Sequence, residues 1–252
     1  MLKGLVSVTF RKLEVEEIIK LTKKAGLDGI EWGSDIHCPP GEFSHARYIA
    51  DLMADAGLET ISYGSYYRIG TFESFDDYVK TACELETDNI RVWAGSLGSD
   101  AATGKDWSNA VEDSKRIAGL AGDYGIKISF EYHCDTLTDS IDSTLRLLTE
   151  IDTGNVFSYW QPPVDLSIDE NIDAIAKLVS AGKLMNLHVS SWEETPAGVV
   201  KCPLAVRGNE WKSYINEASS GVNALLLEFV KDDDPEIFLK DSAYLMEMLK
   251  EM

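Results

Sequence analysis

Short apolar runs alternate along the whole chain with longer amphipathic segments. The apolar runs are rich in Val, Ile, Leu and aromatic residues, which is typical of parallel strands covered by helices on their outer face. Eight such runs are predicted to be β-strands: Leu5–Phe10, Gly29–Gly33, Thr60–Ser65, Asn89–Gly95, Lys127–His133, Asn155–Gln161, Leu184–Ser190 and Ala224–Val230.

Helical patterns fill the segments after these runs. A glycine often follows a helical pattern directly, as in Ala25-Gly26-Leu27 and Ala56-Gly57-Leu58, where it closes the last helical turn. The predicted helices are Val15–Lys24, Ser44–Ala56, Phe75–Leu85, Trp107–Asp123, Asp139–Ile151, Asp169–Ser180, Asn209–Ala218 and Pro235–Lys250.

Eight strand–helix units in 252 residues predict a (β/α)₈ TIM barrel. The alternative is an open doubly wound sheet, which usually carries a glycine-rich phosphate loop after its first strand. The segment Val8–Leu13 contains no glycine, which favours the barrel. No Pro-, Ser- or Gly-rich linker divides the chain, so a single domain spanning residues 1–252 is expected.

The net charge of −20 limits the classes of partner that this protein is expected to bind. An acidic surface repels nucleic acid and anionic membranes but leaves room for a small anionic molecule at a local basic patch. No apolar run is long enough to cross a bilayer, and no signal peptide is visible. The four cysteines are scattered, which indicates free thiols and a cytoplasmic protein. A homo-oligomer is compatible with the sequence.

Polar side chains stand at the ends of the last four predicted strands. The fifth strand ends in Glu131 and His133, and the next three end near Gln161, His188 and Glu228. In a barrel these ends meet on the face that carries the active site. Two carboxylates, an amide oxygen and an imidazole converging there would suit a divalent metal ion.

Five segments make the sequence resemble the sugar phosphate isomerase/epimerase branch of the xylose isomerase-like TIM barrels. They are Leu27–Gly33, Asn89–Gly95, Ile128–His133, Asn186–Ser190 and Leu225–Phe229. The resemblance implies a metal site built from Glu, Asp, His and Glu. Glu131, His188 and Glu228 match the first, third and fourth of these ligands.

Gln161 departs from this family pattern, which commonly has an Asp followed by a His at the second position. Three interpretations are open. Gln161 ligates the metal through its amide oxygen in a weaker site, or it contacts the substrate while three residues hold the metal, or metal binding is lost.

The resemblance implies a metal-dependent isomerase or epimerase of a sugar, a sugar phosphate or a related hydroxy-carbonyl compound. A bound Mn²⁺, Mg²⁺, Co²⁺ or Zn²⁺ would hold the substrate oxygens, while Glu131 and Glu228 move a proton through an enediolate. The alternatives are a dehydratase, a hydroxy-keto-acid isomerase, and a non-catalytic sugar-binding barrel with a degraded metal site. A nuclease of this superfamily is disfavoured by the charge and by the presence of only four histidines.

Several other residues are candidates for contact with a carbohydrate substrate. His133 should share the face of Glu131 because side chains alternate along a strand. The remaining candidates are His37, Trp93, Arg207 and Lys201. Lys201 and Arg207 lie in a long loop, Ser191–Gly208, of the kind that often forms a lid. Glu31 and Arg91, inside two strands, are expected to form a buried ion pair.

Overall fold

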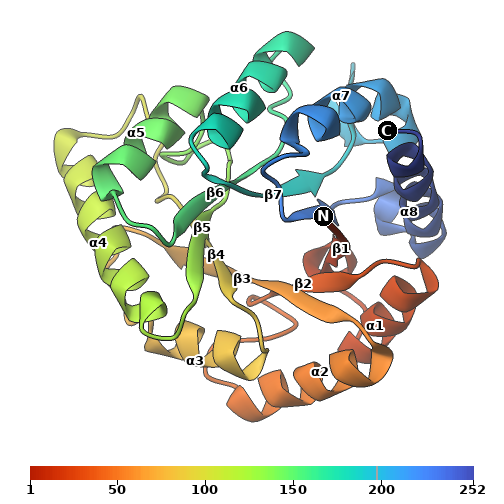
Figure 1. Cartoon of the computed structure of the whole chain (residues 1–252), viewed down its shortest axis with the longest axis horizontal. Helices are drawn as coiled ribbons and strands as arrows, with labels where there is room; N and C mark the ends of the chain where they lie inside the picture. The colour runs from red at the N-terminus through yellow and green to blue at the C-terminus, as the bar shows by residue number, and fades with distance from the viewer. Residues whose placement is uncertain (197) are drawn as a thin grey trace.

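The strands of this protein close into a parallel barrel, and the helices form a ring around it (Figure 1). The computed structural model describes residues 1–196 and 198–252. The barrel strands are β1 (Leu2–Val6), β2 (Gly29–Gly33), β3 (Glu59–Arg68), β4 (Asn89–Trp93), β5 (Lys127–Phe130), β6 (Val156–Trp160), β7 (Leu184–Val189) and β10 (Ala224–Leu227). The helices are α1 (Val15–Lys24), α2 (Phe43–Ala56), α3 (Asp76–Glu84), α4 (Gly104–Gly122), α5 (Ile141–Ile151), α6 (Ile168–Ser180), α7 (Gly208–Ala218) and α8 (Pro235–Lys250).

Strand order around the barrel is β1-β10-β7-β6-β5-β4-β3-β2, so the first and last strands of the barrel pair with each other. This closure confirms the predicted (β/α)₈ barrel and makes the open-sheet alternative wrong. Within the described residues, no helix is both long enough and apolar enough to cross a membrane.

The first strand differs from its predicted position. It covers Leu2–Val6, and the segment predicted as its second half, Ser7–Phe10, forms a 3₁₀ helix (η1). Long-range contacts account for this. Ser7 Oγ accepts a hydrogen bond from Gly33 N at 2.9 Å, and the ring of Phe10 packs edge-on against Phe238 at 5.4 Å. Local β-propensity therefore yields to tertiary packing.

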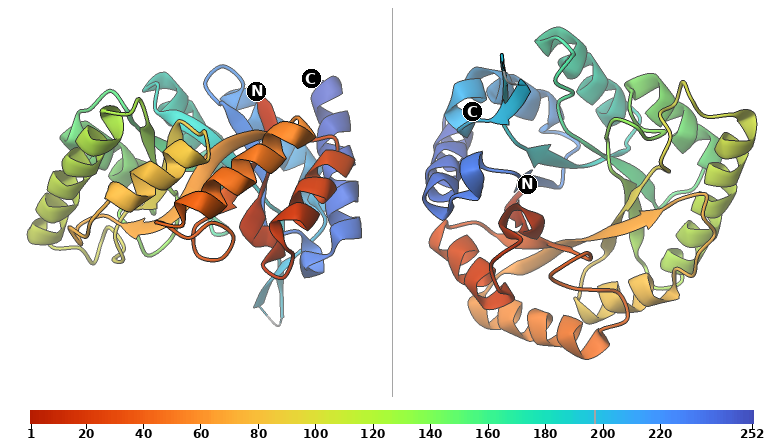
Figure 2. Two further views of the ribbon diagram at one scale, coloured as in Figure 1. Left: turned by 90° about the horizontal axis from the view of Figure 1, so that it is seen from below. Right: turned by 180° about the vertical axis from the view of Figure 1, so that it is seen from behind.

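The loop predicted after the seventh barrel strand contains regular structure. An antiparallel hairpin of β8 (Trp192–Thr195) and β9 (Gly198–Lys201) leads into a 3₁₀ helix, η2 (Leu204–Arg207). Figure 2, left, shows the hairpin projecting from the body of the barrel. Because the strands are short and partly polar, their sequence does not resemble that of the barrel strands.

A buried carboxylate of α8 anchors the segment that follows the hairpin. Leu204 N donates a hydrogen bond to Asp241 Oδ1 at 3.0 Å, and Asp241 is 5% exposed. Burial raises the pKa of Asp241 from 3.8 to about 6, although the hydrogen bond from Leu204 opposes this rise. Folding therefore favours the protonated carboxyl, and its contribution to stability is lost as the pH rises from about 4 through about 6.

We expect Asp241→Asn to raise the free energy of unfolding by about 2 kcal/mol at pH 7 and to have little effect near pH 4. The amide keeps an acceptor for Leu204 N but carries no charge to bury. Urea unfolding at both pH values measures the difference from wild type, with Asp51→Asn as the exposed control. An equal effect at both pH values would contradict this prediction.

Candidate metal centre and cavity

Three ionisable side chains meet at the carboxyl end of the barrel: Glu131, His188 and Glu228, here called the buried trio. Glu131 follows the last residue of β5, His188 lies near the end of β7, and Glu228 follows the last residue of β10. One ligand atom from each lies within 4.8 Å of the other two, and all three side chains are buried. Adjacent parallel strands end at the same face, and this brings distant residues of the chain together.

A buried ion pair lies against the buried trio. Arg91 Nε on β4 is 2.7 Å from Glu31 Oε1 on β2, and the Arg91 guanidinium also pairs with Glu131. Arg91 is 2% exposed and Glu31 is fully buried. The buried Glu31–Arg91 pair predicted from the sequence is therefore confirmed.

Glu31 is held as a carboxylate by its surroundings. Burial would raise its pKa, but Arg91 and His188 hold the pKa of Glu31 well below its ordinary range. Ser62 Oγ at 2.5 Å and Tyr159 OH at 2.9 Å donate to its other oxygen. Gly64 makes room for the pair, because a Cβ there would lie 2.7 Å from Arg91 Nη2 and 2.8 Å from Glu31 Oε1.

His188 lies among three carboxylates. Its Nδ1 is 3.2 Å from Glu228 Oε2 and 3.5 Å from Glu131 Oε1, and its Nε2 is 3.6 Å from Glu31 Oε1. Burial alone would lower the pKa of His188, but Glu228 and Glu31 outweigh burial and raise this pKa to about 9. A proton on His188 thus offsets part of the local negative charge.

The buried trio fits a divalent cation on two counts. Among the described residues, the ring nitrogens of His188 and Glu228 Oε2 form ion pairs but no well-aligned hydrogen bond, and unsatisfied buried polar atoms are uncommon in folded proteins. With His188 neutral, Glu31, Glu131 and Glu228 outnumber Arg91 by two charges, and a dication would balance this excess. Imidazole and carboxylate are common donors for such ions. The structure therefore contains a potential metal site.

The buried trio opens into a cavity of about 730 Å³ at the same end of the barrel. Gln161, the first residue after β6, lines this cavity. Its Nε2 donates a hydrogen bond to Tyr132 O at 2.8 Å, which leaves the amide oxygen available as an acceptor or a ligand. The interpretation of Gln161 as a metal ligand stays a prediction.

Two of the candidate substrate contacts, His133 and Trp93, also line the cavity. Their ring centroids are 4.8 Å apart, and Trp93 also stacks on Tyr66 at 6.2 Å. His133 Nδ1 lies 2.8 Å from Cys134 O, so this nitrogen carries the proton of the neutral ring. Nε2 then keeps its lone pair.

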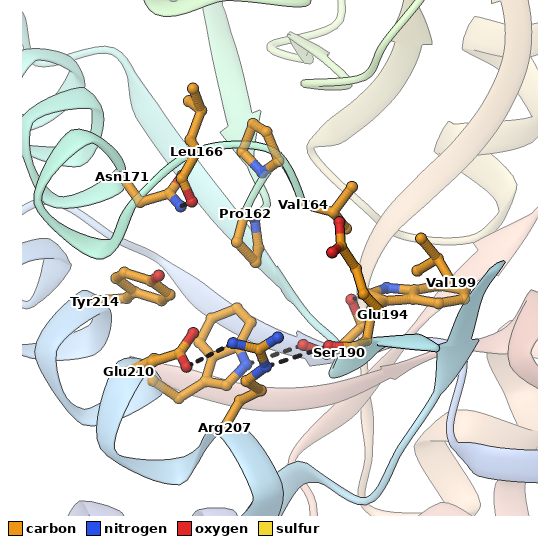
Figure 3. A pocket seen from close by; sticks show the side chains of 13 residues that line it. Pro162, Val164, Leu166, Asn171, Ser190, Glu194, Val199, Arg207, Glu210 and Tyr214 are labelled. Carbon is orange, nitrogen blue, oxygen red and sulfur yellow. Dashed lines mark hydrogen bonds and ion pairs between the residues drawn. The ribbon is translucent and has the colours of Figure 1, made fainter. Parts of the chain in front are cut away.

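The other three candidates do not line this cavity. His37 is buried, with its Nδ1 2.9 Å from Ser7 Oγ. Lys201 Nζ pairs with Asp233 at 2.5 Å. Arg207 lines a smaller pocket of about 60 Å³ beside the cavity, where it pairs with Glu210 at 2.8 Å (Figure 3). The two cavities share a wall made of Pro162, Pro163, Val164, Ser190 and Trp192.

Four aspartates that line the cavity were not expected from the sequence: Asp100, Asp135, Asp139 and Asp165. They lie in the loops that follow β4, β5 and β6. Their position after barrel strands was the available signal, since such loops form the active face. In a chain with 43 acidic residues, however, that signal is weak.

Comparison with known proteins supports the same architecture. The chain is 26% identical to a 3-dehydroshikimate dehydratase of Bacillus anthracis over 164 residues, which are 61% of this chain and 59% of that protein. The chain thus spans less than two thirds of the length of the curated relative that it matches.

Among solved structures, the chain is similar to the probable 3-DHS dehydratase AsbF from Bacillus anthracis, with a TM-score of 0.82, 20% identity and coverage of 98% and 99% of the two chains. It is also similar to the IOLI protein with a bound zinc atom (TM-score 0.77, 13% identity, 100% and 99% coverage). D-psicose 3-epimerase has the same fold (TM-score 0.68, 15% identity, 99% and 97% coverage).

A family model provides the assignment. Residues 19–220 match the model described as xylose isomerase-like TIM barrel, which is most of the chain. This chain therefore belongs to the xylose isomerase-like TIM barrel family.

Proposed function

We propose that this protein is a divalent-metal-dependent dehydratase of a polyhydroxylated carbonyl compound. It removes a proton from the carbon beside the carbonyl group, and hydroxide leaves from the next carbon as water. The observation that carries the proposal is the buried trio, two of whose members, Glu131 and Glu228, line the cavity.

Glu131, His188 and Glu228 would hold the ion, with the amide oxygen of Gln161 beside them. A divalent ion supplies a Lewis acid that polarises a carbonyl oxygen and stabilises the negative charge that develops on it. Arg91 holds the carboxylate of Glu131 in place, and its positive charge offsets one of the three buried negative charges of Glu31, Glu131 and Glu228.

Elimination needs one group that takes a proton and one that gives a proton to the leaving hydroxyl. One side chain can do both in turn. Glu228 and His133 both line the cavity and each offers a lone pair, so either can take the proton from carbon and then give that proton to the leaving hydroxyl. Glu131 is less suited to proton transfer because the Arg91 guanidinium engages one of its oxygens.

The arrangement around Glu131 favours elimination over epimerisation. Epimerisation by two bases needs a proton carrier on each face of one carbon, and Arg91 engages an oxygen of Glu131, one of the two candidates. Similarity to a 3-dehydroshikimate dehydratase supports the same reaction class. The second candidate is isomerisation or epimerisation through an enediolate. It is supported by the closeness of the two glutamates and by the fold of D-psicose 3-epimerase.

The test is incubation of the Mn²⁺- or Mg²⁺-loaded protein in D₂O with 3-dehydroshikimate, its methyl ester and a set of free keto sugars. We expect mass spectrometry to detect a product that has lost one water, and chelation of the metal should lower the rate by about a hundredfold or more. Deuterium incorporation without loss of water would assign the isomerase function instead. Neither change in any compound would overturn both enzymatic proposals.

A further inference from the structure

The charge of the cavity is almost entirely of one sign. Six carboxylates line it: Asp100, Glu131, Asp135, Asp139, Asp165 and Glu228. Arg91 is the single Arg or Lys that lines it within the described residues, and its guanidinium is already committed to Glu31 and Glu131. Among the described residues, no free arginine or lysine is therefore left in the wall of the cavity to receive a phosphate.

Three basic residues in the segments that follow β1 and β7 each pair with a carboxylate. Arg207 pairs with Glu210, Lys201 pairs with Asp233, and Arg11 pairs with Asp35. None of the three lines the cavity. A phosphate that reached any of them would have to displace a carboxylate.

Arg68 has no carboxylate partner in the described chain and contacts a residue of the cavity wall, Trp93. Its guanidinium stacks on Trp93, 4.6 Å from the ring centroid, and its Nη1 donates to Gly95 O at 2.8 Å. It is not part of the cavity wall. Arg68 is thus the arginine to test as an anion contact at the edge of the cavity.

The Glu228 carboxylate in the cavity wall can accept hydrogen bonds from a substrate. Glu228 is 3% exposed, and its Oε2 faces His188 Nδ1 at 3.2 Å but has no well-aligned hydrogen bond among the described residues. A substrate hydroxyl group can donate to this oxygen, whereas a phosphate oxygen would repel it. Trp93 and Tyr66, which stack on each other at 6.2 Å, also line the cavity.

We propose that the cavity selects polyhydroxylated carbonyl compounds without a phosphate or other anionic group, and that the aspartates at its mouth reject anions. This inference rests on the proposed function and narrows its substrate class. The mouth aspartates are Asp100, Asp135, Asp139 and Asp165. At a distance of roughly one Debye length, their summed repulsion is expected to weaken the binding of a phosphate dianion about tenfold at low salt.

The test is calorimetric binding to the Mn²⁺-loaded protein of two matched pairs: D-fructose with D-fructose 6-phosphate, and the methyl ester of 3-dehydroshikimate with 3-dehydroshikimate. We expect the uncharged member of each pair to bind about tenfold more tightly at low salt. This difference in affinity should become smaller in 0.5 M salt. Equal or tighter binding of the anionic member would overturn the inference, as would a failure of both members of each pair to bind.

Substitutions test whether the charge of the mouth aspartates causes the difference in affinity within each pair. The triple variant D100N/D135N/D165N is expected to narrow the gap within each pair, while the control D51N/D55N/D123N, which removes the same number of exposed charges outside the cavity, leaves the gap in place. Loss of the anionic member's binding in Arg68→Gln, with the gap unchanged in the triple variant, would also overturn the inference. Binding requires no turnover, so a failure of the water-loss assay remains a separate result about the proposed function.

Discussion

Replacing Glu228 by glutamine is expected to lower kcat/KM by a factor of about 10² to 10⁴ and to weaken Mn²⁺ binding. The substitution removes a ligand charge and a proton carrier in one step but keeps the shape of the side chain. The carboxylate is 3% exposed and faces His188 at 3.2 Å, so no other acidic side chain of the buried trio can take its position.

The measurements are Mn²⁺ titration calorimetry and the rate of water loss. Glu112→Gln on the exposed face of α4 is the matched control. Thermal unfolding of the metal-free variant shows whether lower activity comes from the site or from a loss of the folded structure. We expect no loss of stability there, because the substitution removes one of the uncompensated buried charges. A variant with wild-type activity and metal affinity would show that Glu228 is neither ligand nor proton carrier.

Replacing Arg91 by methionine is expected to lower the free energy of unfolding by about 3 to 5 kcal/mol. Removing one partner of a buried ion pair leaves the other charge buried without compensation, and here two carboxylates, Glu31 and Glu131, would be left. Urea unfolding measures the change.

Two comparisons make this stability prediction specific. Arg11→Gln removes an ion pair with Asp35 in which the arginine side chain is 45% exposed, and it should cost less than about 1 kcal/mol. The double variant R91M/E31Q should recover part of the loss, because it also removes one of the orphaned carboxylates. This double variant also provides a folded reference if the single variant does not fold. A loss below about 1 kcal/mol for Arg91→Met would mean that water or a rearranged partner already screens these charges.

Most of the barrel could be predicted from the sequence because the same strand–helix pattern repeats along the chain. Buried parallel strands read as short apolar runs, and glycines mark the ends of several helices between them. The segment Ser7–Phe10 was missed because its apolar pattern suits a strand equally well. Only contacts with β2 and α8, such as Phe10 with Phe238, turn it into a 3₁₀ helix.

The candidate site could be predicted in part. Glu131, His188 and Glu228 come together because strand order alone places their strand ends on one face. The partners of individual side chains could not be predicted in the same way, because they depend on distances in the folded protein. Arg207 and Lys201 looked like free basic groups in the sequence, but each has a carboxylate within 3 Å that comes from another part of the fold or from the next helical turn.

If the buried trio holds a divalent ion as proposed, the negative excess beneath the cavity makes the stability of this protein depend on the supply of that metal. A barrel that folds around an excess of buried negative charge, which a proton on His188 offsets only in part, is less stable empty than loaded. Ligand binding to the folded state alone adds about 2.7 kcal/mol of stability when the free ion is at 100 times its dissociation constant. In a cell short of the metal, the chain would therefore be cleared by proteases more quickly, and its level would report on how much metal is available.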